Sequence, residues 1–100
     1  MTELEKRFLI FKFDEEGEKF LINSYNEDEE IFKSNKVLII VNHFDKLIWI
    51  WQGKNSNIRM KVIATQEAPK IRDMYGIDYK ISAIDEGIET ERFQLFFDLI

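Results

Sequence analysis

Few side chains in this 100-residue chain are suited to acid–base, nucleophilic or metal chemistry. There is one histidine, His43, and there are no cysteines. Disulfides, thiolate zinc sites and cysteine nucleophiles are therefore excluded, and His43 has no second imidazole with which to share a metal ion. We interpret His43 as an exposed loop residue, because it lies in a polar stretch between two apolar runs. With no glycine-rich phosphate loop and no nucleophile motif, the sequence argues against an enzyme and against a small-molecule substrate.

Carboxylates are plentiful, and residues 26–30 read Asn-Glu-Asp-Glu-Glu. A calcium-binding loop needs ligands spaced around a pivoting glycine, and this run has no glycine. We therefore expect a solvated connecting loop and no bound cofactor.

The formal net charge of −5 is unevenly distributed along the chain. Residues 1–35 contain five bases and ten acids, residues 36–84 eight bases and four acids, and residues 85–100 one base and five acids. The middle segment is therefore +4 (8 − 4) between acidic flanks. Repulsion from phosphates argues against a nucleic acid partner, whereas a basic face in the middle segment favours a negatively charged protein.

Length and composition predict one globular domain over residues 1–100. The hydrophobic fraction of 45% supplies enough apolar surface to offset the ordering entropy of folding. No apolar run reaches the roughly 18 residues that a membrane span needs, and no basic flank precedes an apolar stretch at the N-terminus. We expect neither a membrane span nor a signal peptide, and hence a cytoplasmic protein.

Apolar runs rich in β-favouring residues predict five strands. Residues 7–13 and 18–24 flank a short acidic segment that ends in Gly17, and they predict a β-hairpin. Residues 37–41 show no polar alternation, which is typical of a central strand covered on both faces. Residues 47–51 and 79–84 complete the set.

Two helices are expected to cover this sheet. Residues 55–57 (Asn-Ser-Asn) offer capping side chains ahead of a long periodic segment that runs to Tyr75 and is closed by Gly76. A short terminal helix opens at Thr90. This order predicts an α+β fold in which a five-stranded sheet lies between the long helix and the shorter C-terminal helix.

The long helix carries two apolar faces. The broader face is assigned to the core and comprises Met60, Ile63, Ala64, Ala68, Ile71, Met74 and Tyr75. A narrower stripe contains Ile58, Val62, Thr65 and Pro69, and Pro69 is expected to kink the helix or open its last turns. Two interpretations of the stripe remain. It covers a loop or a neighbouring copy of the protein, or it enters an apolar groove of a partner.

Several motifs follow one another along the chain. They are Arg7-Phe8-Leu9-Ile10-Phe11, Ser34-Asn35-Lys36-Val37-Leu38-Ile39-Ile40, the run Ile48-Trp49-Ile50-Trp51-Gln52-Gly53-Lys54-Asn55-Ser56-Asn57, Ala64-Thr65-Gln66, Ile71-Arg72-Asp73 and Asp85-Glu86-Gly87-Ile88-Glu89-Thr90-Glu91-Arg92-Phe93. In this order they resemble a gelsolin-homology domain of the gelsolin/villin family, whose fold is related to that of ADF/cofilin. The resemblance spans nearly the whole chain. It implies a five-stranded mixed sheet between a long helix along the strands and a shorter helix across them.

The resemblance further implies actin binding. In the family, the outward face of the long helix enters the hydrophobic cleft between two actin subdomains, which leads to monomer sequestration, capping or severing. The positions that correspond to this face are Ile58, Arg59, Val62, Thr65, Gln66, Pro69, Lys70 and Asp73. They largely coincide with the apolar stripe, so we expect actin or an actin homologue as the partner.

Departures from the family pattern bear on regulation. Lys36 and Met60 occupy the positions of an Asp and a Glu that often hold calcium, and neither an ammonium nor a thioether suits a hard cation. We therefore expect calcium-independent binding. Severing usually needs several linked domains, so a single domain favours sequestration or capping. The alternative function is that of a gelsolin-like scaffold domain that does not bind actin, as in vesicle-coat proteins.

Overall fold

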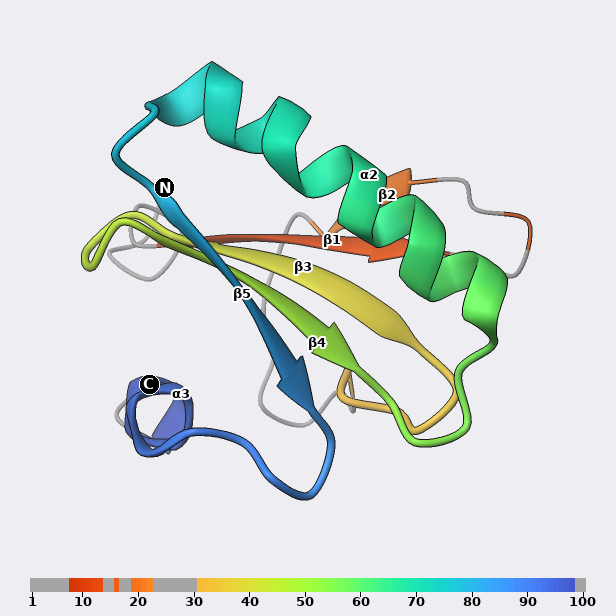
Figure 1. The fold of residues 1–100 in the computed structure, drawn as a ribbon. Coiled ribbons are helices and arrows are strands. Elements are labelled where there is room, and N and C mark those ends of the chain that lie inside the picture. The colour runs from red at the N-terminus through yellow and green to blue at the C-terminus, as the bar shows by residue number, and fades with distance from the viewer. Residues whose placement is uncertain (1–7, 14–15, 17–18, 23–30, 99–100) are drawn as a thin grey trace.

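The structure of the chain is a computed structural model that describes residues 8–13, 16, 19–22 and 31–98 (Figure 1). Its elements, in chain order, are β1 (Phe8–Phe13), β2 (Lys19–Ile22), β3 (Val37–Asn42), β4 (Leu47–Gln52), α2 (Ile58–Tyr75), β5 (Lys80–Asp85) and α3 (Glu91–Asp98). These bounds agree closely with the segments predicted from the sequence. The acidic run at residues 26–30, and most of the acidic segment between the first two strands, lie outside the described residues.

The strands form one mixed sheet in the order β2-β1-β3-β4-β5. β1 pairs antiparallel with both β2 and β3, and β3 pairs antiparallel with β4, whereas β4 and β5 are parallel. Parallel neighbours cannot be joined by a tight turn, and α2 supplies the crossover between them. The predicted α+β class is confirmed.

Every residue of β3 is buried. Val37, Ile39 and Val41 belong to the hydrophobic cluster on one face of the sheet, and Leu38 and Ile40 belong to the cluster on the other face. A strand covered on both faces has apolar side chains on both sides, because successive side chains point in opposite directions, and in β3 only the last residue, Asn42, is polar. This explains the absence of polar alternation in the sequence.

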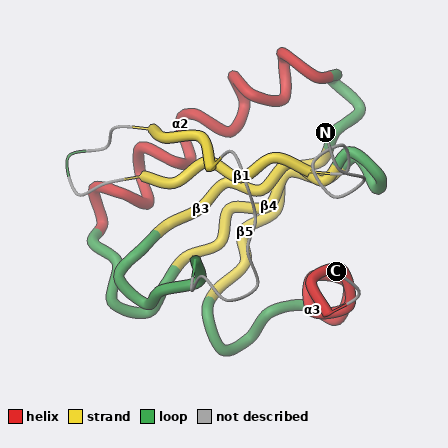
Figure 2. Tube along the Cα trace, turned by 180° about the vertical axis from the view of Figure 1, so that it is seen from behind, coloured by secondary structure: helices red, strands yellow, loops and turns green. Residues whose placement is uncertain are grey.

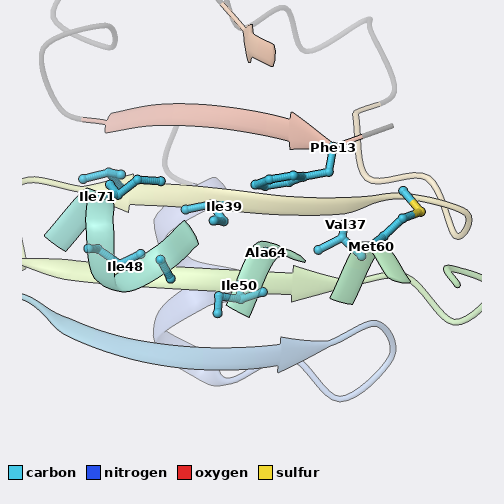
Figure 3. Close-up of a cluster of buried hydrophobic side chains, with 10 residues drawn as sticks. Phe13, Val37, Ile39, Ile48, Ile50, Met60, Ala64 and Ile71 are labelled. Carbon is cyan, nitrogen blue, oxygen red and sulfur yellow. The ribbon is translucent and has the colours of Figure 1, made fainter. Parts of the chain in front are cut away.

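The two helices form the outer layers. α2 covers one face of the sheet and α3 covers the other (Figure 1 and Figure 2). On the α2 side, Ala64 and Ala68 pack among the branched side chains of β3 and β4, where their small size lets the helix lie close to the strands (Figure 3). On the α3 side, the rings of Trp49 and Phe93 meet edge-on with centroids 5.1 Å apart.

Hydrogen bonds cap both ends of α2. The Asn57 side chain accepts a bond from the N–H of Met60 over 2.8 Å, and the Gly76 N–H donates to the Arg72 carbonyl over 2.7 Å. The helix is uninterrupted from its first residue to its last, so Pro69 does not open its last turns, contrary to one half of the expectation. A kink at Pro69 stays a prediction. The caps and the packed inner face hold the helix together although Pro69 donates no backbone hydrogen bond.

Two residues assigned to the core lie at the surface instead. Met74 is 71% exposed and Tyr75 is 37% exposed. The last turn of α2 lies beside the β3–β4 turn, where the Tyr75 ring packs edge-on against His43 at 4.8 Å. Helical periodicity predicts the side of a helix on which a residue lies, but not where the sheet beneath it ends.

The contact with Tyr75 also corrects the interpretation of His43 as an exposed residue. His43 is half-buried and shares a 2.9 Å hydrogen bond with the Tyr79 hydroxyl.

Candidate functional site

The eight predicted binding residues lie on the side of α2 that faces away from the sheet. The opposite side is buried and contains Met60, Ala64, Ala68 and Ile71. Among the eight, Pro69 is half-buried and seven are exposed, namely Ile58, Arg59, Val62, Thr65, Gln66, Lys70 and Asp73. The helix thus gathers the whole set on one surface, which we term the outward face of α2.

Apolar atoms occupy the middle of the outward face. Ile58 is 77% exposed, and Val62, one turn later, is 47% exposed. The Thr65 hydroxyl donates to the Lys61 carbonyl over 2.7 Å, so this polar group is satisfied within the helix, and Pro69 carries no N–H. The stripe therefore offers a partner mainly carbon atoms and few unpaired polar groups. Such a surface is suited to an apolar groove.

Charged side chains border the stripe. Four are basic and one is acidic, namely Arg59, Lys61, Lys70 and Arg72 against Asp73. Two of the basic groups lie near a carboxylate, with Lys70 3.7 Å from Glu67 and Arg72 3.8 Å from Asp73. Arg59 and Lys61 stand in the first turn of α2, which contains no acidic residue. The helix dipole favours negative charge there, so these two cations do not stabilise the helix. A basic border is instead suited to an acidic partner surface.

The motif residues that carried the family resemblance meet near the start of α2. At Gly53, an added Cβ would lie 2.2 Å from the Ser34 carbonyl oxygen, and the same oxygen accepts the Asn55 N–H over 2.8 Å. Glu86 accepts hydrogen bonds from the Lys54 N–H and the Ser34 hydroxyl, each over 2.8 Å. These bonds, led by that from Lys54, hold the pKa of the Glu86 carboxyl below its usual value. No local pattern in the sequence indicates a structural role for this carboxyl, which fixes the turn leading into α2.

The two positions compared with calcium ligands contribute no side-chain oxygen. Met60 is 1% exposed and packs in the core, and Lys36 is half-buried just before β3. Within the part of the chain that the structure describes, no three His, Cys, Asp or Glu side chains are grouped so that they could hold a metal ion. Calcium independence stays a prediction.

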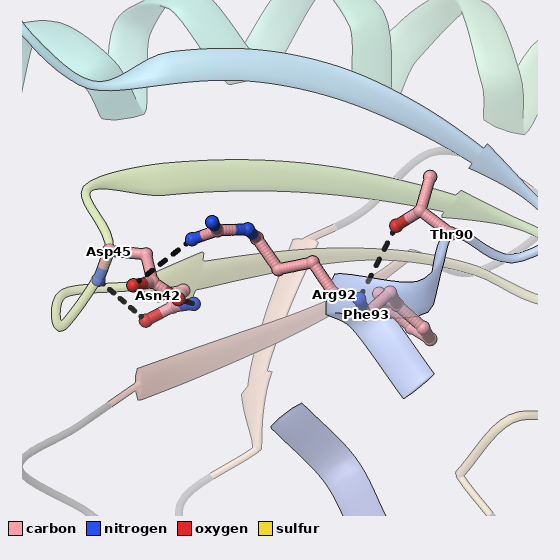
Figure 4. Close-up of polar contacts among 5 residues, drawn as sticks. All are labelled: Asn42, Asp45, Thr90, Arg92 and Phe93. Atoms are coloured by element: carbon pink, nitrogen blue, oxygen red, sulfur yellow. Dashed lines mark hydrogen bonds and ion pairs between the residues drawn. The ribbon is translucent and has the colours of Figure 1, made fainter. Parts of the chain in front are cut away.

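A groove of about 580 Å³ lies on the α3 side of the sheet, between β5 and the start of α3. Four of the charged groups in its lining form two ion pairs. Arg92 lies 3.3 Å from Asp45, and Lys46 lies 2.7 Å from Asp78. Buried Asn42 fixes Asp45 through two hydrogen bonds of 3.0 and 3.1 Å (Figure 4). These contacts fasten α3 to the β3–β4 turn, which is a structural role.

The mixed sheet between two helices defines a small domain of the gelsolin-like class. The family model of the gelsolin repeat matches residues 26–94. The chain belongs to this family.

Solved structures that are similar to the chain include two actin complexes. One is a chain in the crystal structure of the Thorarchaeota ProGel/rabbit actin complex, with 26% sequence identity and a TM-score of 0.74 over 92% of this chain and 97% of that chain. The other is in the crystal structure of the Thorarchaeota 2DGel3/rabbit actin complex, with 26% identity and a TM-score of 0.67 over 93% of this chain and 46% of that chain. No match was found among curated proteins. Among the described residues, no helix is both long enough and apolar enough to cross a membrane.

Proposed function

We propose that this protein is an actin-binding module that docks the outward face of α2 in the hydrophobic cleft between two actin subdomains. The observation that carries the proposal is the exposed apolar stripe led by Ile58 and Val62. A helix that covers one face of a sheet has no structural need for large apolar side chains on its other side. Insertion into an apolar groove removes them from water, which favours binding.

The comparisons support actin as the partner. The two solved structures described above are complexes with rabbit actin. An actin homologue with the same apolar cleft would be recognised through the same chemistry. The basic border of the stripe supports an acidic protein surface, because opposite charges steer association and fix orientation.

The mode that we propose is monomer sequestration or filament capping without calcium. One recognition helix provides one docking surface, whereas severing in the family uses several linked domains. The ProGel chain has a comparable length, since this chain covers 97% of it. The side chains of Lys36 and Met60 provide no oxygen for a calcium ion between strand and helix. The protein is thus proposed to act as a cytoplasmic binding module and not as an enzyme.

Val62→Asp tests whether the outward face binds actin. Because Val62 is 47% exposed, the new carboxylate stays hydrated in the isolated domain, and the free energy of unfolding should change by only about 0.5 kcal/mol. In the complex, the carboxylate would enter an apolar groove without a partner, so affinity for actin should fall by at least about tenfold. Actin polymerisation time courses and thermal melting of the variant measure the two effects.

Ile63→Asp is the matched control, because Ile63 follows Val62 along α2 and packs against the buried cluster. The same carboxylate should cost about 2–5 kcal/mol there and lower the melting temperature by more than about ten degrees. If Val62→Asp lowered the melting temperature strongly and Ile63→Asp left it unchanged, the assignment of the outward and buried faces of α2 would be reversed. If the wild-type protein does not change the time course of actin polymerisation, the result would favour the scaffold function.

A further inference from the structure

Glu86 connects three segments that are distant from one another in the sequence. It directly follows β5, and its N–H donates to the carbonyl of Gln52, the last residue of β4, over 2.9 Å. Its carboxylate accepts the Lys54 N–H through one oxygen and the Ser34 hydroxyl through the other, each over 2.8 Å. The segment before β3, the turn after β4 and the residue after β5 therefore meet at one side chain, at one end of the sheet (Figure 1).

The turn at residues 53–57 is held by these contacts. The Gly53 and Asn55 N–H groups bond to carbonyls of the segment before β3, over 2.9 and 2.8 Å. The N–H between them, that of Lys54, bonds to the Glu86 carboxylate instead. The lowered pKa of the Glu86 carboxyl keeps it ionised at neutral pH, and a hydrogen bond to a charged acceptor is stronger than one to a neutral acceptor. Three successive N–H groups therefore fix the path of the chain just before α2.

The first residues of α2 are the part of the outward face that this turn controls. Met60 is the first buried residue of the helix, so Ile58 and Arg59 stand between the turn and the packed part of α2. Val62 lies between Met60 and Ala64, which are both buried and hold this part of the helix against the sheet. A displacement of the turn would therefore move Ile58 and leave Val62 in place.

We propose that Glu86 is a positioning residue for actin binding, because it sets the turn that places Ile58 in the outward face. This inference rests on the proposed function and deepens it, since Glu86 is not one of the eight predicted binding residues. Affinity depends on the preorganisation of the binding surface, because a side chain that becomes ordered only on binding loses conformational entropy. Without the carboxylate, the 77% exposed Ile58 would be less ordered before binding and would contribute less to affinity.

The test is a double-mutant cycle with Glu86→Ala and Ile58→Ala, measured by fluorescence titration of monomeric rabbit actin. In the wild-type background, Ile58→Ala should raise the dissociation constant by about tenfold, and Glu86→Ala by about fivefold. In the Glu86→Ala background, Ile58→Ala should raise it by only about twofold, because the two changes remove the same interaction. The effects of Glu86→Ala and Val62→Ala should simply multiply, since buried neighbours hold Val62.

Two control variants separate positioning from a loss of stability. Glu86→Gln keeps an oxygen for the Lys54 N–H and an NH₂ group that donates to the Ser34 hydroxyl, so its dissociation constant should stay within about twofold of the wild-type value. Thr90→Ala removes the 3.3 Å bond from the Phe93 N–H at the start of α3, across the sheet from α2, and should not change affinity.

Circular dichroism checks the folding of each variant. If Glu86→Ala does not fold, Ser34→Ala takes its place in the cycle, because it removes one of the two side-chain contacts of the same carboxyl. Equal effects of Ile58→Ala in the two backgrounds would overturn the inference. It is overturned as well if Glu86→Gln binds as weakly as Glu86→Ala, or if Thr90→Ala loses as much affinity.

The proposed function is judged separately, by the wild type and by Val62→Asp. If the wild type binds actin and Val62→Asp does not, equal effects of Ile58→Ala in the two backgrounds reject only the positioning role of Glu86. A wild type that does not bind actin overturns both the proposed function and this inference.

Discussion

Replacing Gly53 by alanine should destabilise the domain through a collision with backbone atoms. An added Cβ at this position would lie 2.2 Å from the Ser34 carbonyl oxygen, 2.6 Å from its carbon and 2.8 Å from the Lys33 carbonyl oxygen. All three are backbone atoms, so no side chain can rotate away. To reach an ordinary contact, the two chain segments must separate by about 1 Å, and overpacking of this kind costs about 1–3 kcal/mol.

The separation would also stretch two hydrogen bonds. The Gly53 N–H donates to the Lys36 carbonyl over 2.9 Å, and the Asn55 N–H donates to the Ser34 carbonyl over 2.8 Å. Each hydrogen bond contributes about 1 kcal/mol to the free energy of unfolding. Alanine raises that free energy by about 0.4–1 kcal/mol, because it restricts the conformations of the unfolded chain. The net loss should be about 3 kcal/mol, which lowers the melting temperature of a 100-residue domain by about 12–24 °C. Urea denaturation followed by circular dichroism gives the free energy directly.

Gly87→Ala is the matched control for this substitution. Gly87 has a φ of 93°, which alanine adopts at a cost of about 1–2 kcal/mol, but the nearest atom to an added Cβ is Cε of the flexible Lys54 side chain at 3.2 Å. Gly53→Ala should therefore be the more damaging change. A loss below about 1 kcal/mol at Gly53, or one no larger than at Gly87, would refute the steric reasoning.

Three further predictions concern calcium, salt and pH. Removing calcium with a chelator should leave actin binding unchanged, because the side chains of Lys36 and Met60 offer no oxygen, and isothermal titration showing one tightly bound calcium per chain would contradict this. Replacing both Lys61 and Arg72 by glutamate should slow association with actin at low salt, because each charge contributes about 1 kcal/mol or less to the attraction. An association rate that stopped-flow measurements show to be unaltered would contradict the role of the basic border. Burial lowers the pKa of His43 below 6.5 in the folded state, so its contribution to stability is present above pH 6.5 and is lost as the pH falls through the folded-state value. The melting temperature should therefore fall on acidification from about pH 7 to about pH 5 more steeply in the wild type than in His43→Gln, and equal slopes would refute the role of this residue.

Much of the candidate site followed from local patterns in the sequence. Helical periodicity separates Ile58 and Val62 from the buried Ala64 and Ala68, because residues one turn apart share a side of the helix. The Asn57 cap at the start of the helix is also a local signal, since its hydrogen bond reaches only three residues along the chain. Whether the outward face binds actin stays a proposal.

The sequence by itself determined the elements, their ends, and which side of each is apolar, because these depend on neighbours within a few residues. Only the tertiary structure decided which distant segments meet. The approach of Gly53 to Ser34 depends on how the strands pair, and so does the position of β5 at the edge of the sheet. The exposure of Met74 depends on where the sheet ends beneath α2, and the pattern of residues within the helix does not indicate that position. Contacts across long sequence separations follow from the packing of the whole chain, and that is why they became visible only in the folded structure.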